Sequence, residues 1–222
     1  MILANLPFMP DQASTIAKEI DTIYLFTVAL STVVSILIVA AIIGFIVKFR
    51  RRRADQIGHR ETAGDWLEIT WTVIPTIVFL ALFFWGAKVY FDTYRVPEGA
   101  DRYYVVGKQW MWKYQHPAGN REINDLHVPV GRPIELVITS EDVIHSFYIP
   151  AFRIKRDAVP GRYSTAWFEA TKVGTFDIFC AEYCGAEHSL MIGRITVMEP
   201  ADYEAWLEDK MPGRTLASTG AD

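Results

Sequence analysis

Two cysteines, a histidine and a methionine lie within twelve residues of one another, in the segment Cys180-Ala-Glu-Tyr-Cys184-Gly-Ala-Glu-His188-Ser-Leu-Met191. Thiolate and thioether ligands select copper, and imidazole binds copper as well. A disulfide between Cys180 and Cys184 would close so small a loop that it would remove little unfolded-state entropy. A single zinc site would leave Met191 without a role, because zinc in proteins takes its sulfur from cysteine. The residue types therefore favour a copper site.

A balanced site needs a second imidazole, and four other histidines are available: His59, His116, His127 and His145. His59 lies between two apolar runs and is excluded by the membrane topology inferred below. His145 comes just after a predicted strand at 133–139. A strand that delivers a histidine, followed by a Cys, His and Met loop between two later strands, is the ligand order of a copper-binding Greek-key barrel. A lone histidine would more often be a core residue, but the cysteines, His188 and Met191 favour His145 as a ligand.

Two runs without charge, at 22–47 and 69–87, precede these residues. The first would form a helix about 39 Å long, and the hydrocarbon core of a bilayer is roughly 30 Å thick, so it can span with some tilt. Soluble core helices rarely lack charge for so long. The first 21 residues lack the basic region and cleavage site of a signal peptide. We therefore expect a retained transmembrane hairpin at 22–94 after an external N-terminal segment at 1–21.

Four consecutive arginines, Arg50 to Arg53, directly follow the first run. Such a run alone is also typical of a nucleic-acid patch, but its position beside a span favours the positive-inside interpretation. The loop at 48–68 is therefore predicted to be cytoplasmic, with both termini on the opposite face. The formal net charge of -4 argues against nucleic acid as a partner.

Residues 95–211 are predicted to form an all-β domain. Short apolar runs alternate with Pro-Gly, Ala-Gly-Asn and Val-Gly turns, which indicates an antiparallel sandwich or barrel. A short helix should begin near Pro200, and the small polar tail at 212–222 is expected to be flexible. The predicted strands are 102–108, 123–128, 133–139, 165–170, 175–179 and 193–198.

The pattern Cys-x-Glu-x-Cys-Gly-x-x-His-x-x-Met, preceded by Asp-Val-Ile-His-Ser-Phe at 142–147, resembles subunit II of the haem-copper cytochrome c oxidases. The resemblance covers about residues 22–207. It implies a two-helix transmembrane hairpin followed by a cupredoxin-like Greek-key barrel that bears a binuclear copper centre, CuA. It also implies that the chain accepts electrons from cytochrome c and passes them to haem in the catalytic subunit, supporting oxygen reduction and proton pumping. The chain itself is expected to bind no haem, because its spans contain no histidine.

The resemblance also implies roles for individual residues. It makes Cys180 and Cys184 the bridging thiolates, His145 and His188 the terminal imidazoles, and Met191 a weak thioether ligand. Glu182 would offer its backbone carbonyl to copper and its carboxylate to magnesium or manganese at the contact with the catalytic subunit. The hydrophobic shell of the site is expected to comprise Phe147, Tyr148, Phe179 and Leu190.

Two further residues have both a family role and a structural alternative. Trp110 matches the exposed tryptophan through which electrons enter, but strict alternation would place it with Trp112 and Tyr114 on one face of a core strand. Trp112 is predicted to be core. Glu68 matches the carboxylate at the mouth of a proton channel, although an acid at a helix start is favourable without any such role.

Departures from the mitochondrial pattern concern the docking of the electron donor. Gln115 stands where those members have glutamate, the connection after it is short, and Lys113 adds a positive charge. Asp142 and scattered acids remain to steer a basic cytochrome. We therefore expect electron uptake to depend only weakly on salt, from cytochrome c or another c-type donor.

The expected partners are catalytic subunit I, other oxidase subunits and the lipid bilayer, with the copper domain on the periplasmic side of a bacterial cytoplasmic membrane. A quinol oxidase subunit would lack the copper ligands. A nitric oxide reductase subunit with the same centre remains an alternative, as does a membrane-anchored copper chaperone or sensor.

Overall fold

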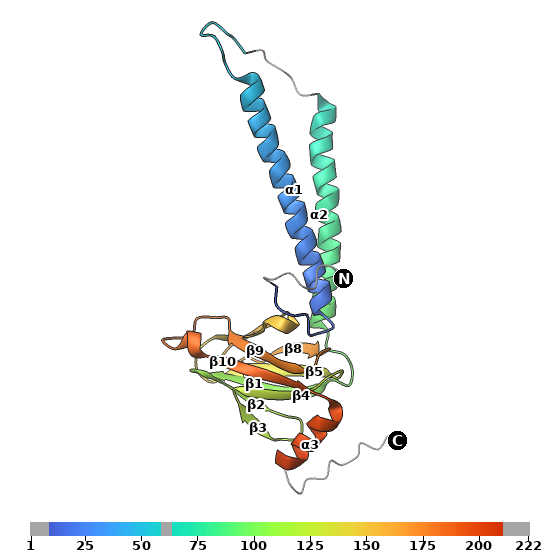
Figure 1. Cartoon of the computed structure of the whole chain (residues 1–222), viewed down its shortest axis with the longest axis vertical. Coiled ribbons are helices and arrows are strands. Elements are labelled where there is room, and N and C mark those ends of the chain that lie inside the picture. Colours follow the sequence, from blue (N-terminus) through green and yellow to red (C-terminus); the bar gives the residue numbers. More distant parts are fainter. Residues whose placement is uncertain (1–8, 59–63, 211–222) are drawn as a thin grey trace. The chain divides into compact units, whose positions relative to one another are not determined.

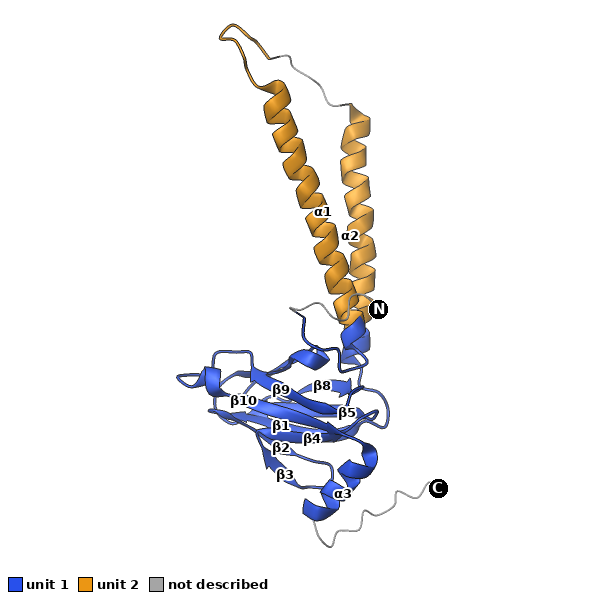
Figure 2. Ribbon diagram, in the orientation of Figure 1, with its two compact units in different colours: residues 1–18, 91–222 blue, residues 19–90 orange. Residues whose placement is uncertain are grey.

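The computed structural model describes residues 9–58 and 64–210 (Figure 1). The chain divides into two compact units, one of residues 19–90 and one that joins residues 1–18 to residues 91–222 (Figure 2). His59, the tail predicted at 212–222 and the first eight residues of the predicted N-terminal segment lie outside the described residues.

The first unit contains two long helices, α1 (Ala17–Phe49) and α2 (Asp65–Tyr94). Both are long and apolar enough to cross a membrane, and their most apolar stretches are not buried within the protein. The Thr27 and Thr32 hydroxyls donate hydrogen bonds of 2.8 Å to backbone carbonyls four residues earlier. These polar groups therefore need no water. The two uncharged runs thus form helices whose apolar side chains face outward, as a membrane hairpin requires.

The second unit is a β-sandwich of two five-stranded sheets (Figure 1). In spatial order, the first sheet comprises β3 (Arg121–Ile123), β2 (Met111–Gln115), β1 (Asp101–Lys108), β5 (Pro133–Ser140) and β8 (Ser164–Glu169). The second comprises β4 (Asp125–Pro129), β10 (Ile192–Met198), β9 (Gly174–Cys180), β6 (His145–Ile149) and β7 (Ile154–Ala158).

The pairing of the strands is mixed. The β1–β5 and β4–β10 pairs are parallel, and the other neighbours are antiparallel. A hairpin of helices followed by an all-β domain is the predicted order of elements. All six predicted strands are present within two residues of their expected ends, together with four more: β2, β3, β6 and β7.

The core lies between the two sheets and is rich in aromatic side chains. Trp112 and Tyr114 of β2 and Phe147 of β6 are fully buried and meet edge to face. Trp110 precedes β2, which begins at Met111, and lies half-buried in the preceding turn, where it packs against the edge of the same core. Trp112 is therefore core, as predicted, whereas Trp110 lies outside the strand and the structural alternative of strand alternation does not apply to it.

Residues just before α1 pack on the β-sandwich. Ala13 is fully buried, and its backbone bonds to Ala151 at 3.0 Å and to Thr171 at 2.9 Å. The Ser14 hydroxyl donates to the Phe152 carbonyl at 2.9 Å. This strap, residues 10–17, is thus tied to the same unit as the strands.

Candidate metal centre

The ends of two adjacent strands position the predicted ligands. His145 opens β6, and Cys180 closes β9. Because β6 and β9 pair with Phe147 opposite Cys180, His145 and Cys180 lie close together although 35 residues separate them in the chain. The segment after Cys180 then turns through a short 3₁₀-helix at His188–Leu190 and reaches β10. The segment thereby places Cys184, His188 and Met191 close to the ends of β6 and β9 that carry His145 and Cys180.

The two thiols form the centre of the group. Their sulfur atoms are 3.8 Å apart, and both cysteines are buried and free. That separation is well beyond the roughly 2.05 Å of a disulfide bond. The Cys180 sulfur lies 3.8 Å from Nδ1 of His145 and 3.2 Å from the backbone carbonyl oxygen of Glu182. Three of these residues, His145, Cys180 and Cys184, place their donor atoms within 4.8 Å of one another.

The second thiol has its own neighbours. The Cys184 sulfur lies 3.4 Å from Nδ1 of His188 and 3.8 Å from the Met191 sulfur. All the side chains predicted as copper ligands therefore converge, and an imidazole nitrogen faces each thiol. We call His145, Cys180, Cys184, His188 and Met191 the sulfur–imidazole group.

Burial and the neighbouring Cys180 thiol raise the pKa of Cys184 to about 12. The metal-free thiol is therefore protonated at neutral pH, and a bound metal ion must displace the proton. The donor set suits this exchange, since two thiols, two imidazoles and a thioether match the soft ligands that copper prefers. The group is thus chemically fit to hold copper.

Two further residues, Asp142 and Gln109, form hydrogen bonds with the sulfur–imidazole group that were not predicted from the sequence. An Asp142 carboxylate oxygen lies 2.8 Å from Nε2 of His145, and the Gln109 side chain donates to the Cys184 carbonyl at 2.8 Å. Burial alone would raise the pKa of Asp142, but hydrogen bonds from the Gln109 backbone and His145 outweigh it and lower that pKa to about 2. The spacing of Asp142, three residues before His145 in the sequence, was the signal from which the bond between them could have been predicted.

Glycine permits close packing around the group. A side chain at Gly107 would place its Cβ 2.9 Å from the His145 ring. Gly185 has φ +122°, and its Cβ would lie 2.9 Å from the Gln109 amide and 3.3 Å from the Trp110 ring. Trp110 therefore packs directly against the loop that carries Cys184.

The other predicted residues are placed as follows. The Glu182 side chain is exposed while its carbonyl faces Cys180. Phe147 is buried, but Leu190 is 69% exposed and does not belong to a buried shell in this chain. Glu68 lies in the first turn of α2, in the other compact unit, and is not brought together with the sulfur–imidazole group.

His116 and His127 belong to a different cluster, centred on Glu122. One Glu122 carboxylate oxygen lies 2.7 Å from Nε2 of His116, and the other lies 2.7 Å from Nδ1 of His127. Two aromatic residues of α3 (Pro200–Lys210) complete it. Tyr203 places its hydroxyl 3.2 Å from the buried His116 ring, and Trp206 stacks on His127 at 4.5 Å. We call these five residues the Glu122 cluster.

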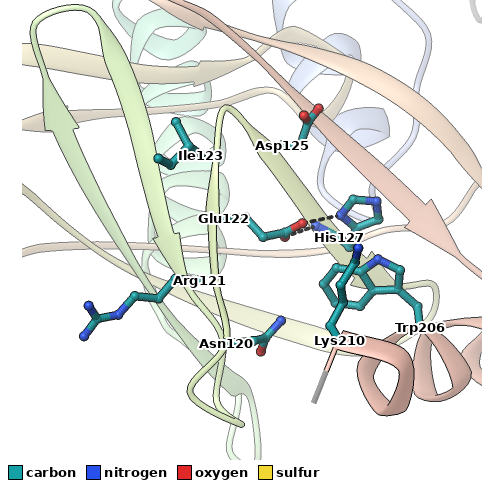
Figure 3. Close-up of a pocket in the computed structure, with 8 residues that line it drawn as sticks. All are labelled: Asn120, Arg121, Glu122, Ile123, Asp125, His127, Trp206 and Lys210. Carbon is teal, nitrogen blue, oxygen red and sulfur yellow. Dashed lines mark hydrogen bonds and ion pairs between the residues drawn. The ribbon is translucent and has the colours of Figure 1, made fainter. Parts of the chain in front are cut away.

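A cavity of about 620 Å³ opens beside the Glu122 cluster (Figure 3). Burial alone would raise the pKa of Glu122, but the bonds from both histidines hold it at about 2. None of the residues lining the cavity belongs to the sulfur–imidazole group. They are Asn120, Arg121, Glu122, Ile123, Asp125, His127, Trp206 and Lys210.

Comparisons with known proteins fit this arrangement. The family profile described as cytochrome c oxidase subunit II, transmembrane domain, matches residues 3–89, and that described as cytochrome c oxidase subunit II, periplasmic domain, matches residues 121–198. Cytochrome c oxidase subunit 2 of Cereibacter sphaeroides is 29% identical over 93% of this chain and 80% of its own length. The protein of that name from Alkalihalophilus pseudofirmus is 33% identical over 88% of this chain and 61% of its own length.

A solved structure supports the same likeness. The crystal structure of the periplasmic domain of subunit II of cytochrome oxidase from Bradyrhizobium japonicum is 34% identical in sequence, with a TM-score of 0.51. The match covers 96% of that domain and 52% of this chain. The cupredoxin-like fold predicted for the β-domain is thereby confirmed.

Proposed function

Because this chain belongs to the cytochrome c oxidase subunit II family, whose members are parts of an oxidoreductase complex, we propose that it receives electrons from a c-type cytochrome and passes them to haem in catalytic subunit I. The observation that carries this proposal is the pair of free, buried thiols 3.8 Å apart with an imidazole nitrogen facing each. Two thiols, two imidazoles and a thioether are the donor types of copper sites that transfer electrons.

The side chains of the sulfur–imidazole group would hold two copper ions. Such a pair would supply one-electron chemistry, with Cys180 and Cys184 as its thiolate ligands. Cys180 and Cys184 are fixed by a strand end and by the loop against Trp110, and His145 is fully buried. The Glu182 carbonyl and the Met191 thioether lie beside opposite thiols. The protein thus fixes its donors before a metal arrives.

Trp110 is the proposed point where electrons enter. It packs on Gly185, next to Cys184 in the chain, and its indole nitrogen is buried without a hydrogen-bond partner among the described residues. The part of Trp110 that remains accessible would meet the donor. Replacing Trp110 with Phe should slow electron uptake while the spectrum of the copper centre stays the same.

Glu182 is the proposed link to a second metal ion. Its carboxylate is exposed while its carbonyl faces Cys180, so one residue can serve two ions on opposite sides. A hard carboxylate oxygen suits magnesium or manganese at the contact with subunit I.

The proposed topology places the β-domain on the periplasmic side of a bacterial cytoplasmic membrane. The strap before α1 is bonded to the β-sandwich, so both must lie on the same side of a bilayer. Two spans between them satisfy this requirement, and Arg50 to Arg53 favour a cytoplasmic loop.

At that cytoplasmic end, Glu68 is proposed to feed a proton channel of the oxidase. It lies exposed in the first turn of α2, where an acid is also favourable without any channel. Glu68→Gln should slow turnover of the assembled oxidase, whereas unchanged turnover would leave Glu68 only its helix-start role.

The decisive experiment is electron paramagnetic resonance of the full chain, purified in detergent, freed of metal and loaded with copper. One unpaired electron coupled to two equivalent copper nuclei is the expected spectrum. Cys184→Ser should abolish it. A single-copper spectrum from the unaltered chain would contradict the proposal.

Two methionines offer a matched comparison for the same measurement. Met191→Leu should change the copper hyperfine pattern, because its sulfur lies 3.8 Å from Cys184. Met198→Leu, seven residues further along in β10, should leave the pattern unaltered.

A further inference from the structure

We propose that Asp142 is a positioning residue for the copper centre, acting through His145; the inference rests on the proposed function. The carboxylate oxygen Oδ1 lies 2.8 Å from Nε2 of His145. A carboxylate can only accept this hydrogen bond, so Nε2 carries the proton and Nδ1 keeps its lone pair. Nδ1 is the atom that faces the Cys180 sulfur at 3.8 Å. Asp142 thus selects the tautomer that can bind a metal ion and aims it at the thiols.

The second imidazole lacks this support. His188 faces Cys184 through Nδ1, is half-buried and contacts the Tyr183 ring, and no carboxylate bonds to its ring among the residues that the structure describes. His145, by contrast, is fully buried. A carboxylate behind a ligand histidine raises its basicity. The two ends of the centre are therefore unequal, with the stronger imidazole donor at His145.

The same carboxylate also holds the turn that carries Trp110. Its other oxygen, Oδ2, accepts a hydrogen bond of 2.8 Å from the Gln109 backbone nitrogen. The Gln109 side chain in turn donates to the Cys184 carbonyl at 2.8 Å. Gln109 is thus bonded to the loops of both ligand segments, and Trp110 is the next residue. Asp142 couples the position of the proposed electron input to the orientation of a ligand.

This role replaces the one expected from the sequence, in which Asp142 was a docking acid for a basic cytochrome. Its side chain is only 25% exposed, and both oxygens accept hydrogen bonds from within the domain. The neighbouring Glu141 is 43% exposed, and its carboxylate pairs with Lys108 and Lys113. Two adjacent acids therefore face different ways, which supplies a matched control.

The test compares Asp142→Asn with Glu141→Gln in the copper-loaded full chain in detergent. Each change removes one negative charge, but only the first weakens the bond to His145. Loss of such an outer partner typically lowers metal affinity 10–100-fold. We expect that loss, measured by chelator competition, for Asp142→Asn alone. We also expect its reduction potential to rise, because a less basic imidazole stabilises oxidised copper less. Equal affinities and potentials in the two variants would overturn the inference.

A folding defect is separated by a third variant. Circular dichroism of the metal-free chains reports whether Asp142→Asn folds, and Asp142→Glu restores a carboxylate at the same position. If Asp142→Glu recovers copper affinity and reduction potential toward the values of the unaltered chain, the positioning role is supported. If its affinity and potential remain the same as those of Asp142→Asn, the positioning role is contradicted. Suppose that the unaltered chain gives the two-copper spectrum, and that Asp142→Asn and Glu141→Gln have the same copper affinity and reduction potential. This result would refute the inference about Asp142 and leave the proposed function standing.

Discussion

The β-domain contains two groups in which a pair of histidines lies close to a carboxylate, and they use their ring nitrogens in opposite ways. In the Glu122 cluster the carboxylate sits between the rings, bonding Nε2 of His116 and Nδ1 of His127. In the sulfur–imidazole group the carboxylate of Asp142 lies behind one ring, and both Nδ1 atoms face thiols.

The difference shows what makes a histidine pair available to a metal ion. In the Glu122 cluster, one ring nitrogen of each histidine is hydrogen-bonded to the shared carboxylate. The other ring nitrogen of His116 is hydrogen-bonded to the Tyr203 hydroxyl. The cluster thus braces α3 against the sheet. The lone pairs of His145 and His188 instead converge on sulfur, so the same residue type is poised for ligation.

The largest expected effect separates the two groups directly. His188→Gln removes a proposed ligand, so copper affinity should fall by more than about 100-fold, beyond the loss typical of an outer partner. His127→Gln should leave copper affinity unchanged, because its ring bonds Glu122. Chelator competition on both chains checks this. Equal losses of copper affinity in His188→Gln and His127→Gln would contradict the distinction between the two groups.

A second effect concerns stability and pH at the Glu122 cluster. The folded-state pKa of Glu122 is lowered from 4.5 to about 2, and with solvent screening of this partly exposed carboxylate the shift contributes on the order of 1–2 kcal/mol of stability at neutral pH. Because the folded pKa is depressed, this stability is present above about pH 4.5 and is lost as pH falls toward 2. Urea unfolding of the metal-free chain should show that loss.

Glu122→Gln should begin less stable at pH 7 and lose less stability over the same acid range. Asp177→Asn, an exposed acid of β9, serves as the control and should follow the unaltered chain. Parallel curves for Glu122→Gln and the unaltered chain would show that the carboxylate does not brace the domain.

A third effect sharpens the role of close packing at the sulfur–imidazole group. Gly185→Ala should cost about 2 kcal/mol, because it combines φ +122° with a 2.9 Å approach to Gln109. It should also alter Trp110 fluorescence. Gly131→Ala, at φ +71° with open space around it, should cost about 1 kcal/mol and leave Trp110 unaffected. Thermal unfolding with fluorescence detection distinguishes them.

The smallest effect lies at the surface between β2 and Glu141. Lys113→Gln breaks a partly exposed ion pair of 2.9 Å and should change stability by less than about 1 kcal/mol. Since the lysines beside Trp110 offset Glu141, electron uptake from cytochrome c should vary little with ionic strength. A steep fall in the uptake rate as salt is added would show that acids steer the donor after all.

The sequence was sufficient to predict the donors of the sulfur–imidazole group, because four of them occupy one twelve-residue segment with a chemically selective composition. Their geometry agrees with that prediction, and the metal itself remains a proposal. The helix hairpin was equally predictable, since long uncharged runs have few alternatives in folded proteins.

The strand β6 and the Glu122 cluster could not be predicted, because they depend on tertiary contacts that local sequence patterns do not indicate. The strand β6 was not among the predicted strands, because it has the burial pattern of a central strand and shows no alternation of apolar and polar residues. The Glu122 cluster joins His116, Glu122 and Tyr203, whose positions show no helical or strand spacing. Only the pairing of β2 with β3 and the packing of α3 bring these residues together.

The strap before α1 imposes an order on assembly. Ribosomes make residues 10–17 early, yet their hydrogen-bond partners Ala151, Phe152 and Glu169 emerge only after both helices have been synthesised. The strap must therefore wait on its side of the bilayer until the late strands arrive there. Its docking is then a late closing step that reports whether the hairpin has inserted with both ends on one side. A chain in which only one of the two helices spans the bilayer would leave the strap and the β-domain on opposite sides, and these bonds could not form.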